Sequence, residues 1–427
     1  MSCKDDFSNE GSLRASLRAT IPRFGLAIIW TGLTAGVSAV CLVLLTKSLS
    51  ADDYGAFCFA QVLFGLILFA VSEAGRPVSF ALAVEQPNKL ASAVFSYWTL
   101  SGGLAALVGI VICWLLPVST VTNAQSVLSI LCVGMIIASL NSSHFLDAQR
   151  RHGIAAFIRF SGEFSSFIIL VVLAVFRALT LTTVAWVFAV KWSTESAISG
   201  IVVLWPRQKT MQSTLIQDIK TSGRSWLTVA GSAIIAAAPL HCGVFFVRAC
   251  CSPQDVAIQG FVQQFAMGLA IAGAIVVRFL QPTITRENTE DTSRFRRVMI
   301  NYFTISASIC LMAMIVLFLL TRFLLAPEFR FCVLPATFQA IAWFVVMSVT
   351  LETTFLLKFS EESFVLGSNF ICLLIYVAIS ALLVPHFAVV GACCATMISA
   401  LIACAVPYLR IAHIGQRANR YLRKMGP

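Results

Sequence analysis

Residues 299–321 read MINYFTISASICLMAMIVLFLLT, a run of 23 residues without a charged side chain. A helix needs about 20 apolar residues to cross the hydrocarbon core of a bilayer. The segment therefore predicts a membrane span. Eleven other segments are similarly apolar, at 24–46, 55–72, 91–116, 124–142, 157–176, 183–205, 225–248, 257–280, 333–357, 364–384 and 388–410. Together they predict an all-α polytopic membrane protein with twelve transmembrane helices.

The composition of the whole chain agrees with this prediction. Hydrophobic residues make up 59% of the 427 residues and charged residues only 11%, and the mean hydropathy is +0.88. Soluble chains average about 25% charged residues, and a folded surface needs more polar area than this sequence offers. Soluble enzymes, nucleic-acid binders and secreted disulfide scaffolds are therefore disfavoured, and we expect no nucleic-acid partner.

The charge distribution predicts the orientation of the spans. With both termini on one side, 24 of the 30 Lys and Arg residues lie on that side, five lie on the other, and Lys191 lies within a span. Loops on the cytoplasmic side carry the excess of Lys and Arg. The bias predicts an even number of spans in a cytoplasmic membrane, with both termini in the cytoplasm.

The segment before the first span, residues 1–23, is expected to lie in the cytoplasm or at the membrane interface. Leu13, Leu17 and Ile21 recur every four residues beside Arg14 and Arg18. This pattern is typical of a short basic helix on a membrane surface. A disordered cytoplasmic tail is the alternative that the sequence leaves open.

The two halves of the chain show a weak internal similarity. At an offset of 202 residues, Ser50, Asp53, Gln61 and Glu85 correspond to Ser252, Asp255, Gln263 and Glu287. Six spans per half is an even number, so the halves are predicted to be parallel repeats, as in several transporter folds. The expected organisation is an N-lobe at 24–205, a cytoplasmic linker at 206–224, a C-lobe at 225–410 and a basic cytoplasmic tail at 411–427.

The stretch at 44–57, LLTKSLSADDYGAF, strongly resembles the first-loop signature of polysaccharide transporters, the Wzx-type O-antigen and exopolysaccharide flippases. The segments at 72–75 and 278–282 resemble the same family more loosely. This family shares a superfamily with multidrug (MATE) exporters and the lipid II flippase. The resemblance implies two six-helix lobes around a central cavity.

The resemblance also implies a function. It predicts a transporter that moves an undecaprenyl-diphosphate-linked oligosaccharide across the bacterial inner membrane by alternating access, for surface or exopolysaccharide synthesis. The implied partners are the lipid-linked oligosaccharide, membrane lipids, and the polysaccharide polymerase and export machinery.

Enzymatic motifs are absent from the sequence. It contains no G-x-x-x-x-G-K-[ST], H-E-x-x-H or G-x-S-x-G pattern, and its five His residues are scattered. We therefore expect no catalytic residues, no metal site and no cofactor. A MATE-like multidrug exporter is the main alternative, although the spans 24–46 and 225–248 lack Asp and Glu. A membrane glycan polymerase or ligase is disfavoured because the predicted outer loops are short.

Three cationic side chains near or within spans are candidate substrate ligands: Arg76, Arg278 and Lys191. Charges at membrane depth are costly and normally face a cavity or a partner. A diphosphate would be stabilised by such cations. The alternatives are that Arg76 is an interfacial residue paired with Glu73, that Arg278 extends to the interface, and that Lys191 pairs with Glu195 on the same helix face.

Four residues are candidates for coupling or gating: Glu73, Glu195, Glu352 and Pro239. Glu352 lies within the tenth predicted span and is a candidate carrier of a coupling proton. Pro239 lies within the seventh span, where it removes a backbone hydrogen bond and should kink the helix.

Overall fold

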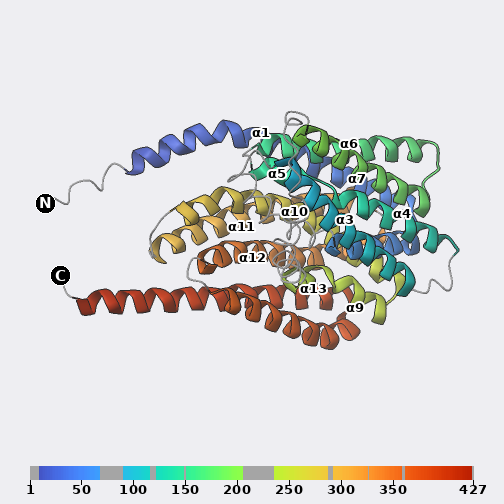
Figure 1. The fold of residues 1–427 in the computed structure, drawn as a ribbon. Coiled ribbons are helices and arrows are strands. Elements are labelled where there is room, and N and C mark those ends of the chain that lie inside the picture. The colour runs from blue at the N-terminus through green and yellow to red at the C-terminus, as the bar shows by residue number, and fades with distance from the viewer. Residues whose placement is uncertain are drawn as a thin grey trace. The chain divides into compact units, whose positions relative to one another are not determined.

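The computed structural model describes residues 9–67, 90–115, 122–148, 151–204, 235–286, 292–325, 327–357 and 361–425. Within these ranges the secondary structure consists of helices and turns, with no strand (Figure 1). Its helices are α1 (Asn9–Ser48), α3 (Leu90–Leu115), α4 (Thr122–Ser139), α5 (Ser143–Ala148), α6 (His152–Val175), α7 (Leu181–Leu204), α9 (Gly243–Cys250), α10 (Pro253–Arg286), α11 (Thr292–Phe323), the 3-10 helix η3 (Pro327–Cys332), α12 (Val333–Leu357) and α13 (Glu362–Met425). Residues 51–67 and 235–241 are also helical.

Each of the twelve predicted spans overlaps helical residues in the described chain. Six helical stretches meet the length and hydropathy needed to cross a membrane: Gly25–Ser48, His152–Val175, Leu181–Leu204, Phe295–Phe323, Pro327–Thr353 and Ser363–Ile414. Long apolar helices that leave much apolar surface exposed are typical of membrane spans. The predicted all-α multi-pass fold is therefore confirmed.

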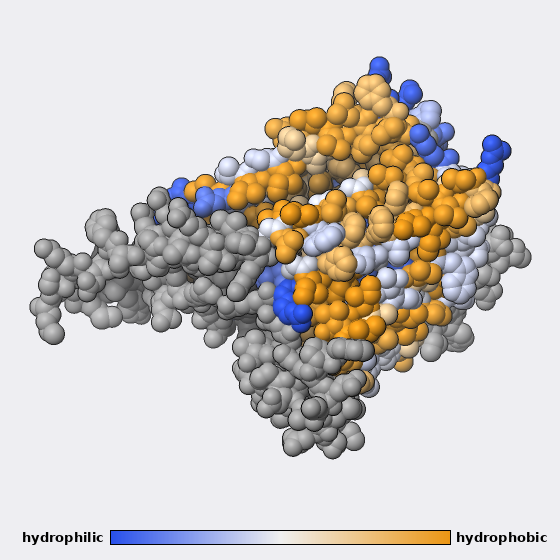
Figure 2. Space-filling view, turned by 90° about the horizontal axis from the view of Figure 1, so that it is seen from above, coloured by the Kyte–Doolittle hydropathy of each residue, from blue (hydrophilic) through white to orange (hydrophobic). Residues whose placement is uncertain are grey.

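The exposed surface of these helices is apolar. Phe323, Leu311 and Leu409 are 74%, 65% and 68% exposed, and hydrophobic side chains cover much of the visible face in Figure 2. A soluble monomer rarely exposes a continuous apolar patch of this kind. The surface is suited to contact with lipid chains.

The chain divides into two compact units. Unit 1 comprises residues 1–40, 71–173 and 184–227, and unit 2 comprises 41–70, 174–183 and 228–427. The predicted boundaries of the N-lobe and C-lobe remain predictions. In unit 1, α1 is helical from Asn9, so the described part of the N-terminal segment continues directly into the first span.

Within unit 2, the helix at 51–67 packs closely against α10. A Cβ added at Gly55 would lie 3.3 Å from the backbone nitrogen of Ala257, and one added at Gly260 would lie 2.6 Å from Cys58 Sγ. Glycine is required where two helices approach this closely. Further along the same seam, Gln264 Nε2 donates a hydrogen bond of 2.5 Å to Gln61 Oε1.

The two turns matched by the internal similarity have the same local structure. Ser50 Oγ accepts a hydrogen bond from the backbone nitrogen of Asp53, and Ser252 Oγ accepts one from Asp255, both at 3.2 Å. Each serine hydroxyl also donates to the aspartate side chain three residues later. A serine in this position satisfies a free N–H group at the start of a helix. Both helices therefore begin at equivalent positions of the proposed repeats.

The eleventh and twelfth spans are joined by a sharp kink within α13. The helix is interrupted at Ala388, where φ is 45° and ψ is −123°. Positive φ is unfavourable for a residue with a Cβ. Nearby, an added Cβ at Gly391 would lie 2.5 Å from the carbonyl oxygen of Leu383. The tight passage from 364–384 to 388–410 thus depends on the absence of a side chain at Gly391.

We expect Gly391→Ala to lower the unfolding temperature of the purified protein in detergent, because its Cβ would collide with backbone. Gly367→Ala, on the same helix but in open space, is the matched control. The control variant Gly367→Ala should stabilise the helix by up to about 1 kcal/mol, since alanine has a higher helix propensity than glycine. Equal shifts for the two variants would contradict the packing described at Gly391.

Candidate functional site

Unit 1 contains a charged cluster formed by three helices. Lys191 of α7 forms an ion pair with Glu163 of α6, and the side chains are 19% and 8% exposed. Ser38 of α1 donates a hydrogen bond of 2.6 Å from Oγ to Glu163 Oε1. Pairing offsets the cost of holding a charge at membrane depth. The Glu163 carboxylate is thus the centre that joins α1, α6 and α7.

Glu195 lies beside this pair. Asn141, which follows α4, donates from Nδ2 to Glu195 Oε2 at 3.4 Å. A Cβ added at Gly162 of α6 would lie 2.6 Å from Glu195 Oε1, so the carboxyl group of Glu195 rests directly against the backbone of α6. We name Glu163, Lys191 and Glu195 the charged cluster, and Arg159 of α6 is a second cation that acts electrostatically on Glu195.

The ion pair of Lys191 is formed across helices. The sequence placed Lys191 and Glu195 on one helix face, and the structure adds Glu163 of α6 as a direct partner of Lys191. Ser38 and Asn141 were not singled out from the sequence, because a single polar residue in an apolar span gives no signal of what it faces.

Unit 2 has a neutral polar interior at a helix break. Residues 235–241 are helical, Cys242 forms a turn, and α9 begins at Gly243. The break follows Pro239 by three residues. Proline removes a backbone hydrogen bond and disturbs the helix around it. Side chains from other helices bond the carbonyl oxygens there: Thr396 Oγ1 donates to Pro239 O and Gln339 Nε2 donates to Leu240 O, both at 3.1 Å.

The same interior holds His241. A hydrogen bond of 3.0 Å joins His241 Nδ1 and Gln263 Nε2, and the edge of the His241 ring meets the Trp343 ring at a centroid distance of 5.5 Å. His241, Gln259, Gln263 and Gln339 are each at most 2% exposed. Of these four residues, Gln339 bonds the backbone at the helix break directly, and His241 and Gln263 bond each other.

Glu352 of α12 is fully buried in unit 2. Cys404 Sγ donates a hydrogen bond of 3.1 Å to Glu352 Oε1, and among the described residues Glu352 Oε2 has no hydrogen-bond partner. Leu351 and Phe355, its neighbours on α12, belong to a hydrophobic cluster. The carboxyl group therefore lies in surroundings that provide little compensation for a negative charge.

Three further predicted residues lie wholly or partly outside the described residues. Arg76 and Glu73 lie outside the described residues. The backbone of Arg278 lies in α10, but its side chain is outside what the structure describes. Their predicted roles remain predictions.

A Gly162→Ala substitution is expected to push the Glu195 carboxyl group away from α6 and to lower the unfolding temperature. Gly103→Ala, which meets open space on α3, is the control and should be neutral or slightly stabilising. A Gly162→Ala, Glu195→Ala double variant should recover much of the lost stability, since it removes the colliding group. Thermal unfolding in detergent measures all three, and the absence of any recovery would contradict this contact.

Comparisons with known proteins support the fold. No protein-family model matches the sequence, and no curated protein matches it. Solved structures do match. The lipid II flippase MurJ in an inward closed conformation has a TM-score of 0.69 at 11% identity, over 94% of this chain and 93% of that one.

Multidrug transporters match similarly well. An inward-facing MATE transporter of the MOP superfamily has a TM-score of 0.68 at 12% identity, over 91% of this chain and 99% of that one. A point mutant of the Vibrio cholerae MATE transporter VcmN has a TM-score of 0.67 at 13% identity, over 95% and 98%. The chain therefore has the twelve-helix fold of the MOP-superfamily transporters, and identities this low show the fold alone.

Proposed function

We propose that the protein is a transporter that moves an undecaprenyl-diphosphate-linked oligosaccharide across the bacterial inner membrane by alternating access. Two observations support this proposal. The first is the fold shared with transporters, one of which is described as a lipid II flippase. The second is the signature at 44–57, which resembles that of polysaccharide flippases. The proposed orientation has both termini in the cytoplasm, and the polymerase and export machinery remain proposed partners.

The observation that carries the proposal is the position of Lys191. Its side chain, 19% exposed, belongs to the candidate span α7, and its ammonium group is paired with Glu163. A substrate diphosphate is a second anion of the kind that an ammonium group binds through charge-assisted hydrogen bonds. In the proposed cycle the diphosphate competes with Glu163 for Lys191. Arg76 and Arg278 are proposed as further substrate contacts.

The second candidate function is export of cationic drugs. The carboxyl groups of Glu163 and Glu195 in the charged cluster are groups that pair with cationic ligands. Several of the matching structures are MATE transporters. Against it stands the lack of Asp and Glu in the spans 24–46 and 225–248. A glycan polymerase or ligase remains the less favoured alternative because the predicted outer loops are short.

Proteoliposomes containing the purified protein and a lipid-linked oligosaccharide provide the test. The fraction of glycan on each leaflet is read from its accessibility to a lectin added outside. Lys191→Met should slow flipping by about ten-fold or more, because about 1.4 kcal/mol of lost stabilisation gives a factor of ten in rate. Lys191→Arg, which keeps the charge, should retain part of the activity.

Two outcomes would contradict the flippase proposal. One is a leaflet distribution that the wild-type protein leaves unchanged. The other is a deletion strain with normal surface glycan and lowered tolerance of cationic drugs, which would favour the exporter. A Lys191→Met protein that unfolds would be identified by its unfolding temperature, and Ser38→Ala, which weakens the same cluster without removing a charge, then serves in its place.

We also propose that Glu352 carries a coupling proton, that Glu195 takes part in coupling, and that the break after Pro239 is a gating point. The burial of Glu352 with a thiol as its hydrogen-bond donor supports the first role.

The variant Glu352→Gln keeps the shape of the side chain and removes its ability to gain or lose a proton. We expect it to abolish the response of transport to an imposed pH gradient while leaving transport without a gradient largely unchanged. An unaltered gradient response would exclude Glu352 as the proton carrier.

A further inference from the structure

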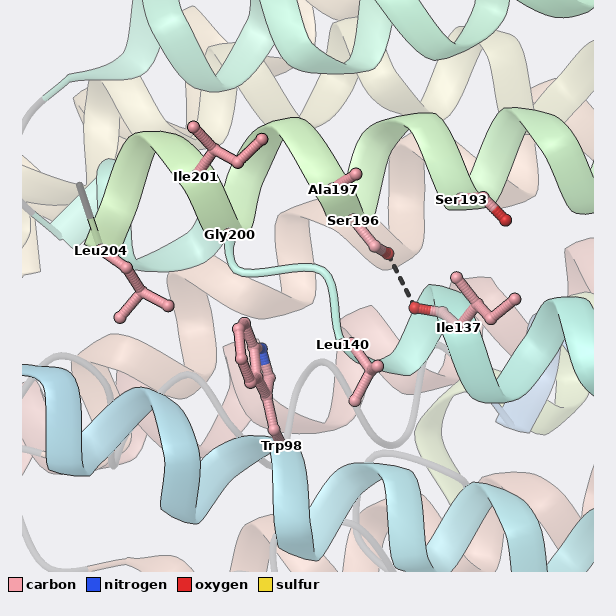
Figure 3. Close-up of a pocket in the computed structure, with 9 residues that line it drawn as sticks. All are labelled: Trp98, Ile137, Leu140, Ser193, Ser196, Ala197, Gly200, Ile201 and Leu204. Atoms are coloured by element: carbon pink, nitrogen blue, oxygen red, sulfur yellow. Dashed lines mark hydrogen bonds between the residues drawn. The ribbon is translucent and has the colours of Figure 1, made fainter.

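A cavity of about 510 Å³ lies in unit 1 beside the charged cluster. Its walls come from α3, the end of α4 and α7, and include Trp98, Leu140, Gly200 and Leu204 (Figure 3). In Figure 3 the Trp98 ring extends from α3 toward α7. Small-molecule sites have volumes of about 300–1,000 Å³, so the cavity is of the size that holds a ligand.

The polar groups on these walls are already hydrogen-bonded within the protein. Ser196 Oγ donates to Ile137 O and Ser193 Oγ donates to Ala189 O, both at 2.7 Å. Trp98 Nε1 donates to Ser142 Oγ at 2.9 Å. Polar ligands such as sugars need unpaired donors and acceptors in a buried site. The cavity instead presents an apolar surface, and this surface is suited to a hydrocarbon chain.

The walls are held in place by hydrogen bonds around a helix end. The chain leaves α4 at Leu140, and the backbone nitrogen of Ser142 donates to Ser199 Oγ of α7 at 3.0 Å. The Ser196 and Trp98 bonds fix the other sides. A cavity between elements tied in this way is formed before a ligand arrives, which lowers the entropic cost of binding.

The cavity is open at exposed positions of α7. Ile201, one of its wall residues, is 58% exposed, and Ala197 on the preceding turn of α7 is exposed as well. Because α7 is long and apolar enough to cross a membrane, an exposed apolar side chain such as Ile201 is suited to contact with lipid chains. A chain can therefore enter this cavity from the bilayer without crossing a polar region.

The cavity and the charged cluster adjoin along two segments. Glu195 directly precedes the wall residue Ser196 on α7, and Asn141, which bonds Glu195, directly follows the wall residue Leu140. An apolar cavity next to charged groups fits an amphiphile that has a hydrocarbon chain and an ionic head.

We propose that this cavity binds a segment of the polyisoprenoid chain of the lipid-linked substrate. The inference rests on the proposed function for the identity of the chain, and it assigns the binding of that chain to α3, α4 and α7. A phospholipid acyl chain and a sugar are the competing occupants.

The test uses a polyisoprenyl phosphate with a photoactivatable diazirine in its chain, reconstituted with the full-length protein in liposomes. After illumination, peptide mass spectrometry locates the labelled residues. We expect labelling at Trp98, Ile137 and Ile201. Gly200→Leu should lower this labelling by about ten-fold, because its side chain fills the cavity and about 1.4 kcal/mol of lost binding corresponds to that factor.

The control is Val190→Leu, a substitution at an exposed position of α7 that is not a wall residue, and it should leave labelling unchanged. A Cβ at position 200 lies 3.4 Å from the Trp98 ring, an ordinary contact, so Gly200→Ala should fold normally and reduce labelling partially. This variant replaces Gly200→Leu if the larger side chain prevents folding.

Three results would overturn the proposal. The first is that Gly200→Leu and Val190→Leu reduce the labelling equally. The second is that a diazirine phospholipid labels the cavity and excess polyisoprenyl phosphate does not displace it. The third is that a photoreactive sugar phosphate without a lipid chain labels the cavity. The flipping assay is read separately. Specific labelling without flipping would keep the chain-binding site and reject the proposed function, whereas flipping without labelling would do the reverse.

Discussion

An ionic side chain inside a membrane span must be compensated within the protein, and the pair of Lys191 and Glu163 is how unit 1 meets this constraint. The pair fixes which faces of α6 and α7 meet, and the hydrogen bond from Ser38 adds α1 to the same point. Glu195 then occupies the space that Gly162 leaves open. The charged cluster and the neighbouring apolar cavity both include residues of α7, where Glu195 directly precedes the wall residue Ser196.

The two units use different chemistry in their interiors. Unit 1 concentrates formal charge, whereas unit 2 surrounds a broken helix with amides, an imidazole and hydroxyl groups. A neutral polar interior satisfies backbone groups at a helix break without the cost of burying ions. Among the described residues of unit 2, Glu352 is a carboxyl group held among apolar residues, and Arg410 and Glu361 form a partly exposed ion pair.

Much of the fold follows from the sequence because the requirement to span a bilayer is local. A run such as 299–321 needs no knowledge of its neighbours to be identified as a span, and the boundary predicted between 364–384 and 388–410 agrees with the kink at Ala388. The cluster was harder to predict. The spacing of Lys191 and Glu195 is visible along one helix, but the pairing of Lys191 with Glu163 depends on how two helices rotate against each other. The apolar cavity depends on packing in the same way, and no residue pattern marks it.

The seam between the helix at 51–67 and α10 has a consequence for studying motion. Cys58 is fully buried there, with its sulfur 3.3 Å from Gln264 Nε2 and its side chain directly against Gly260. A thiol in this position is shielded from aqueous alkylating reagents for as long as the two helices remain together. Because other cysteines such as Cys250 are exposed, it is the rate of modification at Cys58 itself that reports how often the seam separates.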